Sequence, residues 1–480
     1  MPIFDDVAWN FTLDNFGSVW SLMVQLGLLL ISLLLGNLLV KTIPFLRKAF
    51  IPASLLGGVL LLLLNLLVNF IVKECGVADF QLVDRQEMQV ITYHALAIGF
   101  IAMTLKIVQK DRKISTLKVI QNGVLEGGTY MLQAVLGLAT VLIFFWAGYK
   151  VDGEKIFYDS GILLPLAFGQ GPGNAMTWDL KFSEFFDFGG NGSVGLSLAS
   201  LGFIIACVVG VVYINVFKRK GQIQPRDDVV VRKVTDFEDE GEIGDVESAD
   251  KFSIQIGLVV LAYAIAFGIM CVFNVTAFTK GIAWSLNFIW GVLAAFLIKL
   301  TLKGLRKAKI VKKKYVNNYQ MDRIAGFAFD LMIIAGVAAI DIQDVKKFIA
   351  PIAALVVVGT IATYIYIRLI TRHCFKDLAH EMFLVNYGTL TGTASNGVIL
   401  LREIDPAFAT NASSIFILSQ VPSMICVAPL LLLLNFSAKS LKNTLIAGGI
   451  FLGLFVGYTL FLVFSPKFKR KKPPKIVGEE

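Results

Sequence analysis

Two apolar stretches that are interrupted near their midpoints determine the architecture of this chain: GILLPLAFGQGPGNAMTWDLKF at 161–182 and HEMFLVNYGTLTGTASNGVILLRE at 380–403. Glycine and proline in the first, and glycine with small polar residues in the second, disfavour a continuous helix at these points. Unpaired backbone at membrane depth is tolerated only where protein or a water-filled cavity satisfies it. Each interruption therefore predicts a binding site.

The surrounding sequence is that of a polytopic helical membrane protein. Of its 480 residues, 56% are hydrophobic and 16% charged, against about 25% charged residues in soluble domains. Helical apolar runs of about 20 residues match the roughly 30 Å of a bilayer core. They predict eleven spans, near 19–40, 51–72, 90–107, 123–148, 191–217, 252–273, 282–302, 323–340, 349–370, 412–435 and 443–464.

Basic residues in the short loops predict the orientation. Those that follow the first, third and fifth spans share one side, which the positive-inside rule identifies as the cytoplasm. The N-terminus is then outside and the C-terminus is cytoplasmic. The net charge of +9 follows from these loops, so we expect no nucleic-acid partner. A full crossing by either interrupted stretch would invert all later loops, so we expect the first to enter and leave from outside and the second from inside.

These assignments predict an all-α membrane protein built from two inverted five-helix repeats, each with a re-entrant hairpin. The expected units are a first repeat at 19–217 with the hairpin at 161–182, a cytoplasmic linker at 218–251, a second repeat at 252–435 with the hairpin at 380–403, an extra helix at 443–464 and a basic tail at 465–480. The alternative is that the small residues of the two stretches only allow close helix packing.

Two hairpins that meet near the midplane combine two kinds of binding group. Helix N-termini attract anions, and carbonyl or hydroxyl oxygens suit a cation such as Na⁺. This combination predicts co-transport of a small anion with a cation. The expected substrate contacts are Gly171, Gly173, Asn174, Thr393, Ser395 and Asn396, and the expected sodium contacts are Gly169, Gln170, Thr391 and Gly392.

Charged residues inside the predicted spans add two candidates. Arg402, in the second arm of the second hairpin, is expected to hold a substrate carboxylate; the alternative is a pair with Glu403 or Asp405 at the cytoplasmic interface. Asp330 lies inside its predicted span, where a carboxylate needs a partner. That partner is either a bound Na⁺ or a structural hydroxyl. Glu126, near the start of its span, is interpreted as an interface residue.

The two interrupted tips, with Phe45–Lys48, Ile51-Pro52 and Gly57-Gly58 before the second span, resemble the bacterial sodium/glutamate symporter family over roughly residues 20–435. That family is related in fold to the sodium-coupled 2-hydroxycarboxylate symporters, whose hairpin arginine binds carboxylate, a role that the resemblance assigns to Arg402. The resemblance implies an inner-membrane homodimer that carries glutamate inward with Na⁺. It also implies that a hairpin-bearing domain moves against a fixed scaffold, as in an elevator.

Two alternatives to glutamate or dicarboxylate transport remain at this point. One is a citrate- or malate-type sodium symporter, and the other is a sodium-translocating membrane subunit of a decarboxylase-like complex. The sequence has no P-loop, no serine nucleophile elbow and no paired catalytic carboxylates, so we expect neither enzymatic activity nor an organic cofactor.

Overall fold

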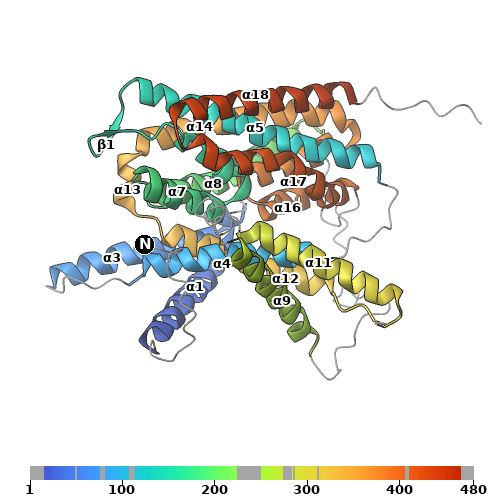
Figure 1. The fold of residues 1–480 in the computed structure, drawn as a ribbon, viewed down its shortest axis with the longest axis horizontal. Helices are drawn as coiled ribbons and strands as arrows, with labels where there is room; N and C mark the ends of the chain where they lie inside the picture. Colours follow the sequence, from blue (N-terminus) through green and yellow to red (C-terminus); the bar gives the residue numbers. More distant parts are fainter. Residues whose placement is uncertain are drawn as a thin grey trace, which may run out of the picture.

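The computed structural model describes residues 16–48, 51–75, 82–106, 114–223, 250–273, 284, 287–310, 313–405 and 410–465. Within these ranges the regular secondary structure is helical except for one antiparallel hairpin, in which β1 (Lys150–Val151) pairs with β2 (Glu154–Lys155). The predicted all-α fold class is therefore confirmed for the described residues (Figure 1).

Ten of the described helices are long and apolar enough to cross a membrane. They are α1 (Phe16–Thr42), α3 (Ala53–Glu74), α4 (Arg85–Leu105), α5 (Thr116–Trp146), α8 (Ser193–Arg219), α9 (Lys251–Val272), α11 (Asn287–Lys307), α14 (Ile349–Cys374), α17 (Ala412–Ser437) and α18 (Leu441–Phe464). Each overlaps a predicted span. The remaining predicted span forms α12 (Asn318–Ala338), which is 21 residues long but contains three charged side chains, Asp322, Arg323 and Asp330.

The remaining helices are shorter. They are α2 (Pro44–Lys48), the 3-10 helix η2 (Ser160–Ile162), α6 (Leu163–Gln170), α7 (Pro172–Phe186), α13 (Ile342–Lys347), the 3-10 helix η4 (Lys376–Leu378), α15 (Ala379–Thr391) and α16 (Ala394–Arg402). Each interrupted stretch of the sequence thus forms a pair of helices, α6 with α7 and α15 with α16, and the two members of each pair pack against each other.

Capping side chains fix where several helices begin. The Asp84 carboxylate accepts hydrogen bonds from the backbone amides of Gln86 and Glu87 at the start of α4. Asp250 caps α9 in the same way. These caps satisfy amides that have no partner inside the helix, so a single acidic residue before an apolar run defines the helix start.

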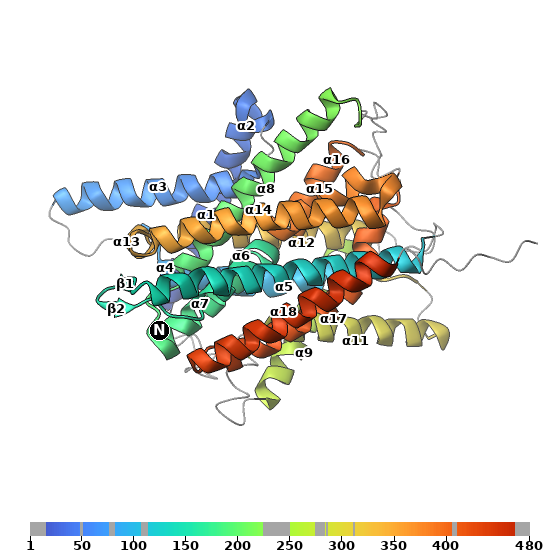
Figure 2. The ribbon, with the colours of Figure 1, turned by 90° about the horizontal axis from the view of Figure 1, so that it is seen from above.

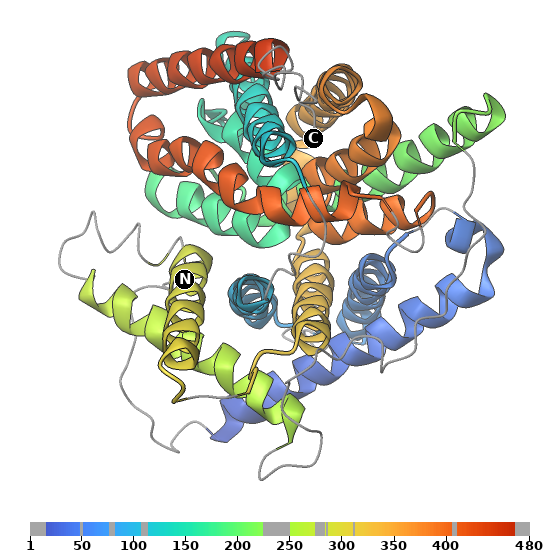
Figure 3. The same cartoon turned by 90° about the vertical axis from the view of Figure 1, so that its right-hand side faces the viewer.

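The helices form two layers. In the first layer, α1, α3, α4, α9, α11 and α12 are linked by mutual contacts. In the second, α5 packs against α14, α17 and α18, while α8 packs against α6, α7 and α15. Figures 1 and 3 show the first layer below the second. Figure 2, from above, shows α5, α14 and α18 alongside one another.

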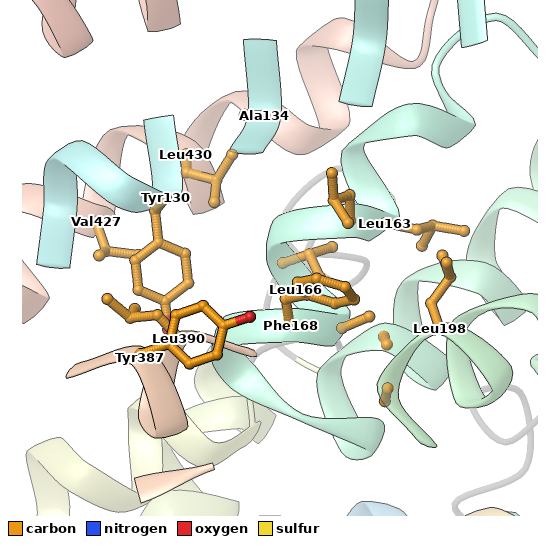
Figure 4. Close-up of a cluster of buried hydrophobic side chains, with 14 of the residues drawn as sticks. Tyr130, Ala134, Leu163, Leu166, Phe168, Leu198, Tyr387, Leu390, Val427 and Leu430 are labelled. Atoms are coloured by element: carbon orange, nitrogen blue, oxygen red, sulfur yellow. The ribbon is translucent and has the colours of Figure 1, made fainter. Parts of the chain in front are cut away.

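The second layer contains the largest hydrophobic core, which includes α6 and α15. Figure 4 shows part of it, with Tyr130 from α5, Phe168 from α6 and Tyr387 from α15. The two layers meet where α7 and α8 contact α4 and α12. This contact places both broken helix pairs near the boundary between the layers.

Candidate functional site

The first interruption is a single residue. Helix α6 ends at Gln170 and α7 begins at Pro172, and Gly171 between them has φ +83° and ψ −174°. Only glycine adopts this backbone conformation without strain. Pro172 has no amide hydrogen to continue the α6 ladder and suits the first position of a new helix. The sequence therefore breaks the helix at the residue where the glycines predict it.

The second interruption consists of Gly392 and Thr393, between the end of α15 at Thr391 and the start of α16 at Ala394. The two arms fold back on each other at a glycine pair: a Cβ at Gly388 would lie 2.7 Å from the Gly397 Cα. A larger side chain at either position would separate the arms. Close packing at these glycines thus holds the second interruption as a tight turn.

The two interruptions lie against each other, although they are separated by over two hundred residues. A Cβ at Gly171 would lie 3.3 Å from the Thr393 Cγ2 and 3.8 Å from the Met332 Cε on α12. On the next turn of α12, a Cβ at Gly336 would lie 3.2 Å from the Pro172 Cβ. Residues predicted independently from two distant stretches therefore form one junction, which rests on α12.

Buried polar atoms without partners surround this junction. In the described part of the chain, four of the predicted residues have such atoms: Gln170 Oε1, both Oδ1 and Nδ2 of Asn174, Thr393 Oγ1 and Asn396 Nδ2. The Asn174 side chain is completely buried. Buried polar groups are almost always hydrogen-bonded in folded proteins. The unsatisfied atoms at the junction therefore leave hydrogen-bonding capacity that water, an ion or a polar ligand can use.

The helix ends at the junction carry opposite partial charges. Helices α7 and α16 begin there and present N-terminal amides, which favour anions. Helices α6 and α15 end there and present C-terminal carbonyls, which favour cations. The junction thus combines partial charges of both signs from helix ends alone.

Other predicted residues have packing roles. A Cβ at Gly173 would lie 3.0 Å from the Leu96 side chain of α4, and Gly169 packs against the Tyr130 ring of α5. The Thr391 hydroxyl donates to the Tyr387 carbonyl at 2.6 Å. These residues lie next to the junction and shape its walls.

The structure does not place Asp330 at the junction. Asp330 is within hydrogen-bonding reach of Ser54 on α3, whereas Met332 and Gly336 of the same helix face the interruptions. The position of a residue within its predicted span indicates how far along the helix it lies. It does not indicate which neighbouring helix its side chain faces. The side chains of Ser395 and Arg402 lie outside the described part of the structure. Asp405 lies three residues after Arg402, and its carboxylate accepts a hydrogen bond from the Thr410 amide at 2.9 Å.

A polar face of α5 supports the second interruption, and it does not belong to the predicted site. Gln133 donates to the Leu390 carbonyl and to the Thr363 hydroxyl, both at 2.9 Å. Glu126 is buried, with 2% of its surface exposed, and its position at the membrane interface stays a prediction. The sequence signal was the helical spacing of Asn122, Glu126 and Gln133 within an otherwise apolar span.

The comparison with protein families decides the identity. The family model of the sodium/glutamate symporters matches residues 20–382, which is more than half of the chain. The chain belongs to the sodium/glutamate symporter family. As a member of this family it is a membrane transporter and not an enzyme, with Na⁺ as the implied coupling ion and glutamate as the implied substrate. A search of curated proteins finds no match. The family match contains the first interruption and ends before the second.

Proposed function

We propose that this symporter binds glutamate, or a related dicarboxylate, together with Na⁺ at the junction of the two interruptions. The observation that carries the proposal is the cluster of unpartnered polar atoms where Gly171 meets Thr393. Because α7 and α16 begin there, the substrate carboxylates lie toward Asn174, Thr393 and Asn396, with Gly171, Gly173, Ser395 and Arg402 completing the substrate site.

The cation lies on the other side of the junction, toward the ends of α6 and α15. Carbonyl oxygens at Gly169, Gln170, Thr391 and Gly392 supply hard ligands of the kind that Na⁺ prefers. Binding of the anionic substrate together with Na⁺ leaves less net charge at the junction than binding of either ion alone. This charge balance is the physical basis of coupling. A separate variant, Asp330→Asn, tests whether Asp330 holds the cation. If it does, this change weakens the dependence of transport on Na⁺.

The transport movement we propose is of the elevator type between two inverted repeats. The composition of the two layers supports it: spans one to three and six to eight, α1, α3, α4, α9, α11 and α12, form the first layer. In each half, the fourth and fifth spans and the interrupted stretch between them join the second layer. The same division in both halves supports the proposed inverted repeat. The second layer would move with the hairpins, and the first layer would form the scaffold of an inner-membrane homodimer.

Reconstitution in liposomes tests the function. With an inward Na⁺ gradient, the purified chain should accumulate labelled glutamate, and replacing Na⁺ by K⁺ should abolish the uptake. Citrate and malate in the same assay test the related symporter activity. Na⁺ movement without any solute, dependent on added partner proteins, would contradict the proposal and favour a decarboxylase-type subunit.

The topology has its own test. Asp187, after α7, and Lys376, before α15, are both exposed, so cysteine at either position should react with a membrane-impermeant reagent. The proposed hairpins place Asp187 outside and Lys376 inside. Labelling of both from one face would overturn the opposite entry of the two hairpins while leaving the transport result intact.

A further inference from the structure

Glu126 is a buried carboxyl group in the second layer that the proposed transport site does not use. It lies roughly 15 Å along the axis of α5 from Thr116. Burying an ionised carboxylate away from water costs several kcal/mol unless a partner compensates it. The groups around Glu126 therefore determine which form of the carboxyl can exist there.

Neutral hydrogen-bonding groups from two helices surround the carboxyl. Asn122 Nδ2, one turn earlier on α5, is 2.8 Å from Glu126 Oε1. Gln420 Nε2 on α17 is 3.3 Å from Oε1 and 3.4 Å from Oε2. The Ser419 hydroxyl is 3.4 Å from Oε1. The group is thus well hydrogen-bonded, but none of these partners carries a charge.

Among the described residues, no fixed positive charge compensates the Glu126 carboxyl. In the part of the chain that the structure describes, Glu126 forms no ion pair. Among the described residues, the titratable groups that interact electrostatically with Glu126 are the Tyr130 phenol on α5 and the Cys426 thiol on α17. Tyr366 of α14 and Tyr458 of α18 pack behind them. Phenols and thiols are uncharged at neutral pH. An ionised Glu126 therefore has no counter-charge among these groups.

The same network reaches the second broken helix pair. Asn386 on α15 donates from Nδ2 to Asn122 Oδ1 at 2.8 Å. Asn386 is completely buried, and its Oδ1 has no partner among the described residues. Figure 4 shows α5 and α15 together further along, where Tyr130 lies near Tyr387 and Leu390. One chain of hydrogen bonds thus links the carboxyl to the helix that leads to the second interruption.

Either a proton or a metal cation can neutralise such a carboxyl. A hard metal cation takes a shell of oxygen ligands. The closest groups here include the N–H donors of Asn122 and Gln420, whose hydrogens would face a metal ion at the same place. A proton needs no ligand shell and leaves these hydrogen bonds in place. The geometry favours the proton.

We propose that Glu126 is a proton-binding site that controls how α15 is seated on α5. With the proton bound, the network from Glu126 through Asn122 to Asn386 is neutral and can stay dry. Loss of the proton leaves a charge that draws water between α5 and α15 and loosens the arm that ends at Thr391. The proposal rests on the proposed function only in that α15 leads to the substrate site.

Infrared spectroscopy of the purified protein without substrate tests the proton directly. At neutral pH exposed carboxylates are ionised, so a protonated carboxyl gives a separate C=O band. We expect Glu126→Gln to remove one such band, and Asp159→Asn, a matched change at another buried carboxyl, to leave that band unchanged. A spectrum in which Glu126→Gln removes only an ionised carboxylate band would overturn the proposal. If Glu126→Gln cannot be purified, Ser419→Ala should shift the same band by removing one hydrogen bond.

Glutamate affinity at saturating Na⁺ tests the link to α15. From about pH 6 to about pH 9, where exposed carboxylates stay ionised, we expect affinity to fall in the wild type and in Asp159→Asn but to be constant in Glu126→Gln. The same decline in all three proteins would overturn control of α15 by Glu126. Failure of the proposed function would look different: no Na⁺-dependent glutamate binding at any pH, with the infrared result unchanged.

Discussion

Asp159 is buried at the end of the second layer where α17 ends and α18 begins, before the first broken helix pair. Its carboxylate accepts a hydrogen bond from the Ser437 hydroxyl at 2.8 Å. Burial raises the pKa of this carboxyl to about 8, an effect that the hydrogen bonds from Ser437 and Thr444 reduce but do not cancel. In the unfolded chain the pKa returns to about 3.9.

This pKa difference predicts how the stability of the protein depends on pH. Between about pH 4 and pH 8 the folded state keeps the Asp159 proton that the unfolded state has lost, so stability falls as pH rises through this range. Asp159→Asn should remove this decline, as measured by thermal unfolding of the purified protein at several pH values. Glu154→Gln, an exposed carboxylate on β2, is the control and should retain it. An unchanged slope in Asp159→Asn would show that the carboxyl is already ionised.

Arg402 is the one positive side chain that we place in the substrate site. Lysine keeps the charge but loses the planar fork, so Arg402→Lys should weaken glutamate binding by about 1.5–3 kcal/mol, or roughly ten- to over a hundred-fold. If the guanidinium only pairs with Glu403 or Asp405 near the interface, the change should cost at most about 1 kcal/mol of stability and leave affinity intact. Glutamate affinity of the purified variant at saturating Na⁺ separates the two roles.

The break between α6 and α7 depends on Gly171. Any side chain at its φ of +83° strains the backbone by about 1–3 kcal/mol. Gly171→Ala should therefore lower both stability and glutamate affinity, because its Cβ would also press on Thr393. Gly189 has φ +74° and open space around it, so Gly189→Ala is the matched control. We expect it to lower stability alone, as measured by thermal unfolding and by glutamate binding.

At this level the sequence predicted most of the elements. Long apolar runs with few charges predicted the ten apolar helices, and Gly171-Pro172 and Gly392-Thr393 predicted the two breaks, because backbone conformation is a local property. The meeting of Gly171 with Thr393 is a contact between distant parts of the chain, and topology alone could only suggest it. The face of Asp330 and the burial of Glu126 depend on helix rotation against neighbours, which an apolar pattern does not determine.

The whole molecule consists of two layers with the junction of the breaks between them. An ion pair from Arg85 on α4 to Asp344 on α13, at 3.2 Å, and a hydrogen bond from Arg85 to Ser193 on α8, at 2.8 Å, join the layers at one end. Glycines and apolar side chains also lie in this contact, for example Gly173 of α7 against Leu96 of α4 and Gly336 of α12 against Pro172 of α7.

Binding of glutamate and Na⁺ at the junction of the two breaks is tested most directly by a substitution at Asn174. Both polar atoms of this buried side chain have no hydrogen-bond partner among the described residues. Asn174→Leu keeps the shape but removes hydrogen bonds to a charged ligand worth about 1.5–3 kcal/mol, so affinity should fall roughly ten- to a hundred-fold.

The measurement is equilibrium binding of labelled glutamate to the purified protein across a series of Na⁺ concentrations. Asn69→Leu is the control, since it makes the same change on α3, where Asn69 bonds to Asn65 and to the Leu82 amide. We predict that affinity rises with Na⁺ in the wild type and in Asn69→Leu and is lost in Asn174→Leu. Wild-type, Na⁺-dependent affinity in Asn174→Leu would contradict the placement of the site at this junction.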